Sequence, residues 1–147
     1  MLQIIRANLT HLDTIVPLFK AYRHFYGHES TDTEARNFLR ERIERDESVI
    51  FLAQKDSQLV GFTQLYPLFS SVNMSRICVL NDLYVAESAR RHGVASALLR
   101  AAAQHAKRTG ARGLMLQTGR NNYPAQALYE YTGWKREDCF YWYALAV

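Results

Sequence analysis

The chain contains 147 residues with a mass of 17.0 kDa, of which 48% are hydrophobic and 22% charged; this balance is typical of one compact soluble domain and excludes a disordered chain. No apolar stretch approaches the length of about 18 residues that a membrane span requires, and the first residues do not resemble a secretory leader. The net charge of +4 is spread along the chain, a distribution that does not favour nucleic-acid binding.

The cysteines and histidines form no recognisable metal or redox motif. Cys78 and Cys139 lie far apart and form no CxxC pair, so we expect reduced thiols in a cytoplasmic protein and no structural zinc. His24 and His28 are spaced to share a helix face. Because no third ligand accompanies them, a surface or pocket-lining role is favoured over metal binding.

Hydrophobic periodicity predicts a series of strands and helices. The first helix begins near Asp13, or kinks at Pro17, because a proline inside a helix clashes with the carbonyl four residues before it. Strands are predicted at residues 2–7, 48–54, 58–68, 76–86 and 112–118, with one or two final strands in 134–147; the other helices are predicted at 33–45, 93–110 and 122–132.

This order predicts a mixed α/β fold in a single domain spanning residues 1–147, since no repeat or linker divides the chain. The strands at 76–86 and 112–118 flank a helix, so they should form a parallel, right-handed βαβ unit. The remaining strands are joined by hairpins. We therefore expect a central, mostly antiparallel sheet with one parallel pair, flanked by helices.

The strand ending at Val85 leads into a turn that is suited to bind an anion. Arg90 and Arg91 supply positive charge, and Gly93 opens a helix with small residues behind it. Successive main-chain N–H groups and the helix dipole attract phosphate at such a turn. The pattern predicts a pyrophosphate site without a GxGxxG or Walker spacing. The alternative is an ordinary connection with surface arginines.

A second informative stretch covers residues 121–134. Asn122 is a good N-cap, and Pro124 fits the first turn of the helix that follows. Leu128 and Tyr129 lie further along that helix, where they could be core residues.

Together the two stretches resemble the GNAT superfamily of acyl-CoA-dependent N-acetyltransferases. The run Arg90-Arg91-His92-Gly93-Val94-Ala95 is similar to the R/Q-x-x-G-x-G/A acyl-CoA signature of that family. The run Asn122-x-x-Ala125-x-x-Leu128-Tyr129-x-x-x-Gly133-Trp134 is similar to its downstream helix motif. The resemblance covers roughly residues 50–135 and implies the GNAT acyltransferase fold.

The resemblance implies acetyl-CoA as co-substrate and direct transfer within a ternary complex. The pantetheine arm would lie along the main chain of Leu83 and Val85, and Tyr129 would protonate the departing CoA thiolate. No acetyl-enzyme is expected, because neither cysteine has a paired His and Asp signal. The implied cofactor-binding residues are Leu83, Tyr84, Val85, Arg90, Arg91, His92, Gly93, Val94, Ala95, Ser96, Asn122, Ala125 and Tyr129.

The acceptor amine arrives protonated and must lose a proton before it attacks the thioester. Asp82 is the candidate general base, directly or through water; alternatively it is a strand-edge carboxylate paired with an arginine. The segment around it is similar to a Glu-Asp-aromatic-aromatic-Val segment of diamine (spermidine/spermine) acetyltransferases, but Asn81 replaces the acidic residue. This substitution argues against a polyamine. Tyr22, Tyr26 and His28 are further candidates for the substrate wall.

The sequence thus predicts an N-acetyltransferase that acts on a primary amine of a small molecule. A peptide or protein amine acetyltransferase, a non-catalytic acyl-CoA sensor and a nucleic-acid-binding module are the alternatives. No metal and no membrane partner are expected. The aromatic run at residues 140–143 predicts either sheet core or the contact of a homodimer.

Overall fold

The computed structural model describes residues 1–147, which divide into two compact units, Met1–Leu116 and Gln117–Val147. The first unit contains, in chain order, β1 (Leu2–Arg6), η1 (Leu9–His11), α1 (Leu12–Phe25), α2 (Asp32–Glu44), β2 (Val49–Lys55), β3 (Gln58–Ser70), β4 (Ser75–Val85), η2 (Glu87–Ala89), α3 (Val94–Arg108) and β5 (Ala111–Met115). The second contains one helix, α4 (Tyr123–Tyr131).

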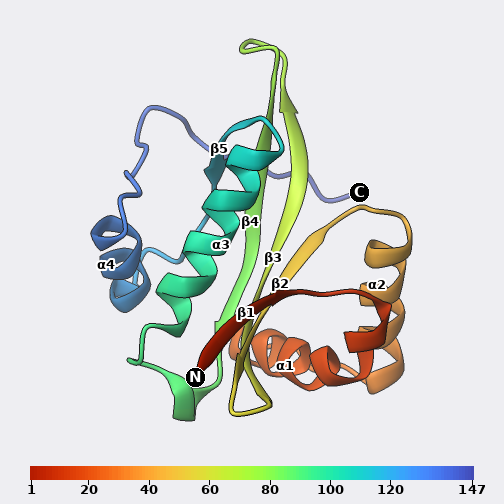
Figure 1. Ribbon diagram of the computed structural model, residues 1–147. Coiled ribbons are helices and arrows are strands. Elements are labelled where there is room, and N and C mark those ends of the chain that lie inside the picture. The colour runs from red at the N-terminus through yellow and green to blue at the C-terminus, as the bar shows by residue number, and fades with distance from the viewer. The chain divides into compact units, whose positions relative to one another are not determined.

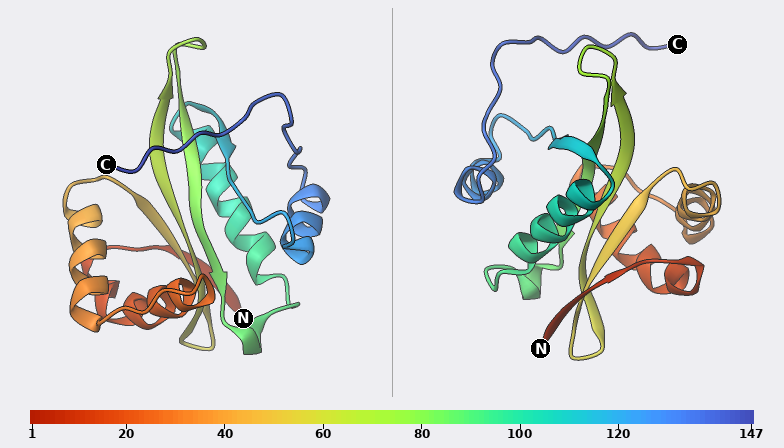
Figure 2. Two further views of the ribbon diagram at one scale, coloured as in Figure 1. Left: turned by 180° about the vertical axis from the view of Figure 1, so that it is seen from behind. Right: turned by 45° about the horizontal axis from the view of Figure 1, so that its top comes forward.

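The first unit is built on a five-stranded sheet with the order β1-β2-β3-β4-β5. Neighbouring strands from β1 to β4 pair antiparallel, whereas β4 and β5 pair parallel across α3. Helices α1 and α2 cover one face of this sheet and α3 covers the other (Figures 1 and 2). The predicted fold class is confirmed. None of the helices has the length and hydropathy that a bilayer-spanning helix requires.

The alternation of side chains along β2 and β3 builds a core on the face of α1 and α2. Ile15, Leu39, Leu52 and Phe62 meet there and are completely buried. Their neighbours in each strand point to the opposite face, as the period of two requires. Phe51, for example, contacts the ring of His105 on α3 at 5.7 Å between centroids.

Two features of β4 shape the region where the predicted site residues lie. Gln64 on β3 pairs with Asp82, but the next residue, Leu65, pairs with Leu80. Asn81 is therefore the extra residue of a β-bulge. The parallel pairing with β5 ends where Val79 lies opposite Met115, so the half of β4 beyond the bulge has a partner strand on one side only.

The predicted boundaries of the helices and of the first five strands hold within a few residues, and Pro17 lies inside α1. The predicted C-terminal strands are wrong. Residues 135–147 contain no strand, and Phe140, Tyr141, Trp142 and Tyr143 are 75–90% exposed rather than part of a sheet core. A strand forms only against a partner strand, and the unit Gln117–Val147 supplies none.

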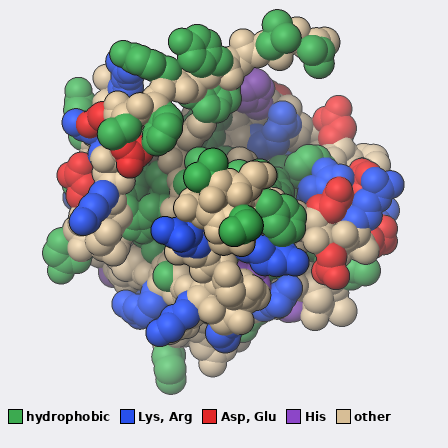
Figure 3. Space-filling model, turned by 90° about the horizontal axis from the view of Figure 1, so that it is seen from above, with side chains coloured by type: hydrophobic (Ala, Val, Ile, Leu, Met, Phe, Trp, Pro, Cys, Tyr) green, Lys and Arg blue, Asp and Glu red, His purple; other side chains and the backbone are tan.

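The charged run on α2 is a solvated helix surface. Arg42 and Arg45 both pair with Glu41, and Arg42 also pairs with Glu47. On the flank at the right of Figure 3, Lys and Arg side chains are accordingly interspersed with Asp and Glu side chains. This helix therefore presents mixed charge instead of a continuous basic face.

Candidate functional site

The turn between η2 and α3 presents a row of free main-chain donors. The N–H groups from Arg91 to Ser96 donate to no acceptor within the protein; the first such bond of the helix runs from Ala97 N–H to the Gly93 carbonyl. Arg91 and Gly93 both have left-handed backbone conformations, with φ of 65° and 78°. Adjoining N–H groups in such a turn, at the start of a 15-residue helix, are suited to bind an anion.

The two arginines of this turn differ in their contacts. Arg90 donates from Nε to the carbonyl of Val85 at 2.8 Å, and its guanidinium lies 5.5 Å from the ring centroid of Tyr84. Arg90 therefore fastens the turn to the end of β4. Arg91 and His92 are exposed, and Arg91 forms no ion pair within the protein. Its charge is therefore available to an external anion.

The main chain of β4 beyond the bulge has one open edge. Ala86 N–H donates to the carbonyl of Val60. The alternation of an antiparallel ladder then turns the main-chain groups of Asp82 and Tyr84 toward β3, and those of Leu83 and Val85 away from it. No strand pairs with β4 on that side. An extended ligand could bind to Leu83 as an added strand would, whereas the main chain of Tyr84 cannot take part.

Asp82 is a buried carboxylate held by two amides. It is 2% exposed. Its Oδ2 accepts a hydrogen bond from Nε2 of Gln64 at 2.7 Å, and its Oδ1 accepts one from Nδ2 of Asn81 at 2.8 Å. Its main-chain oxygen accepts a third, from the Thr63 hydroxyl at 2.8 Å. Both carboxylate oxygens therefore have fixed directions.

No cation compensates the charge of Asp82, so the alternative of a strand-edge carboxylate paired with an arginine is wrong. Burial raises the pKa of Asp82 above its usual value of 3.8, and the hydrogen bonds from Asn81 and Gln64 oppose that rise. A raised pKa brings a carboxylate nearer to the working pH of a general base. Asp82 is thus chemically suited to accept a proton from an amine.

The structure brings most of the predicted substrate residues to the same place. The hydroxyl of Tyr22 on α1 donates to the main-chain oxygen of Asn81 at 3.1 Å. The ring of Tyr26 meets that of Tyr22 edge to face, with centroids 5.2 Å apart. His28 lies beyond the end of α1 and is exposed.

Sequence reasoning missed Gln64 and Thr63, which are both completely buried beside Asp82. The available signal was a pair of polar residues within the otherwise apolar run of β3. A polar residue in a strand usually faces solvent and only rarely contacts a second polar residue in the interior. The two polar residues of β3 therefore do not identify Asp82 as their partner.

The second unit contains the other predicted residues. The side chain of Asn122 accepts from the N–H of Ala125 at 3.3 Å and so caps α4, as predicted. Tyr129 is half-buried, with its ring 6.0 Å from that of Trp134. The N–H of Trp134 returns to the carbonyl of Tyr129 at 2.9 Å, so the turn after the helix is fixed to the residue that carries the phenol.

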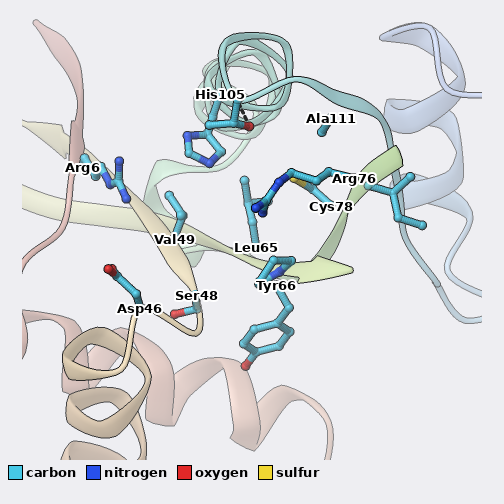
Figure 4. A pocket seen from close by; sticks show the side chains of 13 residues that line it. Arg6, Asp46, Ser48, Val49, Leu65, Tyr66, Arg76, Cys78, His105 and Ala111 are labelled. Atoms are coloured by element: carbon cyan, nitrogen blue, oxygen red, sulfur yellow. Dashed lines mark hydrogen bonds between the residues drawn. The ribbon is translucent and has the colours of Figure 1, made fainter. Parts of the chain in front are cut away.

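A separate hollow of about 260 Å³ lies toward the first residues of β4. The side chains of Arg6, Arg76 and His105 line it from three elements (Figure 4). None of the residues predicted for the cofactor or the acceptor lines this hollow. It is therefore distinct from the region around Asp82.

Comparison with known proteins agrees with this geometry. Residues 15–134 match the model of the acetyltransferase (GNAT) family. The uncharacterized N-acetyltransferase YhfO of Bacillus subtilis is 44% identical over 146 residues, which cover 99% of this chain and 98% of that protein.

Solved structures extend the similarity to the fold. The crystal structure of a probable acetyltransferase superposes with a TM-score of 0.93 at 46% identity, covering 99% of this chain and 97% of that one. An aminoglycoside N-acetyltransferase in complex with CoA has a TM-score of 0.86 at 24% identity, covering 100% and 96% of the two chains.

Proposed function

Because the chain belongs to the acetyltransferase (GNAT) family, we propose that it transfers the acetyl group of acetyl-CoA to a primary amine of a small molecule, by direct attack in a ternary complex. The observation that carries this proposal is the uncompensated, buried carboxylate of Asp82 at the bulge of β4. It adjoins an open main-chain edge that leads to the free donors of residues 91–96.

The residues present fit acetyl-CoA. The free N–H groups of the turn and the charge of Arg91 suit the diphosphate, and the open edge at Leu83 suits the amide-bearing pantetheine arm. An aminoglycoside acetyltransferase with the same fold is known in complex with CoA. The bound co-substrate supplies an acetyl thioester, whose carbonyl carbon the amine attacks.

Asp82 and Tyr129 have opposite proton-transfer roles in this proposal. Asp82 accepts a proton from the substrate ammonium, directly or through water, which frees the nitrogen lone pair to form the new C–N bond. Tyr129 donates its phenolic proton to the sulfur as the C–S bond breaks, and the second proton, which the nitrogen loses on becoming an amide, returns to the Tyr129 phenolate directly or through water. A thiolate is a better leaving group when a proton donor is held beside it, because its charge is neutralised as it forms. We propose that residues 1–147 belong to a single N-acetyltransferase domain.

The surroundings of Asp82 favour a small cationic amine as acceptor. A buried carboxylate attracts an ammonium group, and Tyr22, whose hydroxyl donates to the main-chain oxygen of the neighbouring Asn81, brings an aromatic ring that can stabilise a cation. The structural neighbour that binds CoA is named for aminoglycosides, which are amines of this size class. The neutral Asn81 leaves a single carboxylate in the cluster, so one ammonium group is the preferred match.

The test is release of CoA thiol from acetyl-CoA in the presence of a panel of small primary amines, aminoglycosides and peptides. We expect turnover with at least one small amine, and a fall in kcat/KM of about 10²–10⁴-fold for Asp82→Asn. Asp56→Asn is the matched control, because the side chain of Asp56 is 78% exposed. Thiol release with peptides alone, or equal activity of the two variants, would refute the proposal.

We also propose that the protein acts in the cytoplasm as a homodimer joined through the exposed aromatic residues 140–143. A cytoplasmic location accords with the two free thiols. Burial of these aromatic side chains between copies would remove a large apolar area from water. Light scattering should give twice 17.0 kDa for the wild type and a smaller particle for Trp142→Ser. A monomeric wild type at micromolar concentration would refute the dimer.

A further inference from the structure

Gln64 is the residue closest to the carboxylate of Asp82 that the proposed reaction does not yet use. It lies on β3 directly opposite Asp82 and is completely buried. Its Nε2 donates to Oδ2 of Asp82 at 2.7 Å, whereas its Oε1 is buried and accepts no hydrogen bond. One half of this amide is therefore paired with the carboxylate, and the other half is unpaired.

An unpaired buried carbonyl destabilises a fold, since the oxygen has lost its bonds to water and gained none. An apolar side chain of similar length would fill the same space without that loss. The core alone therefore gives no reason for an amide at this position. The reason lies in its partner, because Asp82 is the group that must change its protonation state.

An amide suits such a partner in both of its states. While Asp82 is ionised, the N–H of Gln64 donates to Oδ2, as observed. Once Asp82 carries a proton on Oδ2, a half turn of the terminal amide places Oε1 to accept that proton as a hydrogen bond. An arginine or lysine could serve only the ionised state, since it has no acceptor.

We propose that Gln64 is a positioning residue, which holds the Asp82 carboxyl in one orientation before and after that group takes the proton of the acceptor amine; this role rests on the proposed function. The proton leaves the ammonium nitrogen for Oδ2 of Asp82, and the nitrogen keeps the electron pair. Gln64 exchanges no proton itself and acts only through its hydrogen bond to Oδ2 of Asp82.

Tyr66 and Tyr22 are titratable side chains near Gln64 and Asp82. On β3, burial raises the pKa of Tyr66, and the charge of Asp82 raises it further, while Arg42 on α2 opposes the rise. Tyr66 therefore stays protonated where Asp82 titrates. The hydroxyl of Tyr22 on α1 donates to the main-chain oxygen of Asn81, and Asn81 carries no charge.

The direct test is a carbon-13 NMR titration of the Asp82 carboxyl in the free protein, assigned by its loss in Asp82→Asn. In Gln64→Met we expect the midpoint to rise by about 1–2 pH units, because both hydrogen bonds of Gln64 to the Asp82 carboxyl are lost and the one to the ionised form is the stronger. Thr63→Val is the matched control, since Thr63 is equally buried but donates only to the main-chain oxygen of Asp82. Equal midpoints in wild type and Gln64→Met would overturn the proposal.

A measurement on the wild type covers the case in which Gln64→Met does not fold. The side-chain amide signals of Gln64, labelled with nitrogen-15, should change with the same midpoint as the Asp82 carboxyl. Gln64 amide signals that do not change with pH around the Asp82 midpoint would overturn the proposal.

Kinetics separates this inference from the proposed function. With the best amine of the panel, the acidic limb of kcat/KM in Gln64→Met should move to higher pH together with the NMR midpoint, and kcat should fall more than KM rises. A shifted NMR midpoint without acetyl transfer to any amine would refute the proposed function while leaving the coupling of Gln64 to Asp82 in place. If Gln64→Met transfers acetyl groups but the acidic limb of its kcat/KM profile does not move, the role of Gln64 is refuted and the proposed function is not.

Discussion

A substitution at Gly93 tests whether the turn between η2 and α3 binds acetyl-CoA, because the backbone conformation of Gly93 can be perturbed without a steric clash within the protein. Its φ is +78°, and a Cβ built on it would meet no atom within 4 Å. In the protein without ligand, the substitution Gly93→Val therefore acts through the backbone and not through crowding. A left-handed conformation costs a non-glycine residue about 1–2 kcal/mol, and more for a β-branched one.

This backbone strain lowers the affinity of the Gly93→Val variant for acetyl-CoA. If the variant turn relaxes to negative φ, the row of N–H groups from Arg91 to Ser96 no longer converges on one anion. Acetyl-CoA must then restore the strained turn on binding, so about 1.4 kcal/mol of strain weakens Kd about tenfold. The valine side chain beside the open turn adds to this loss by standing where the diphosphate approaches.

Gly110 supplies the matched control. It lies at the other end of α3, has φ of +74°, and likewise has open space around a built Cβ. Gly110→Val should lower the melting temperature about as much as Gly93→Val but leave acetyl-CoA affinity near that of the wild type. Calorimetric titration with acetyl-CoA decides the matter. Unchanged affinity in folded Gly93→Val, or equal losses in both variants, would refute the assignment of the diphosphate to this turn.

Two further predictions concern the proton-transfer residues. Tyr129→Phe should lower kcat about 10²–10⁴-fold with little change in acetyl-CoA affinity, since only the proton donor is lost; Tyr131→Phe, 88% exposed on the same helix, is its control, and near wild-type kcat in Tyr129→Phe would show that another donor acts. Asp82 should make the fold less stable as pH rises through its raised folded pKa, because above that pH the native state must hold a buried charge. Asp82→Asn should therefore melt higher than the wild type at neutral pH, by about 2–4 °C for each 1 kcal/mol relieved, and the difference should shrink as the pH falls toward the unfolded value. Thermal melts at several pH values test this, and a constant difference would contradict it.

The sequence alone determined the local features of this protein. The periods of two and 3.6 located the strands and helices, since each element buries one face whatever it packs against. The parallel pairing of β4 with β5 followed from the helix between them. The glycine that opens α3 and the Asn122 cap of α4 were also predictable, because both follow from residues adjacent in the chain. All of these depend on residues close together in the chain.

Only the tertiary structure decided how Asp82 is held. Its partner Gln64 lies 18 residues earlier, and their contact depends on the register of two strands and on the bulge at Asn81. A shift of one residue would turn Gln64 to the other face of the sheet. The C-terminal segment shows the same limit, because its aromatic residues favour a strand, but strand formation requires a partner edge that local sequence cannot provide.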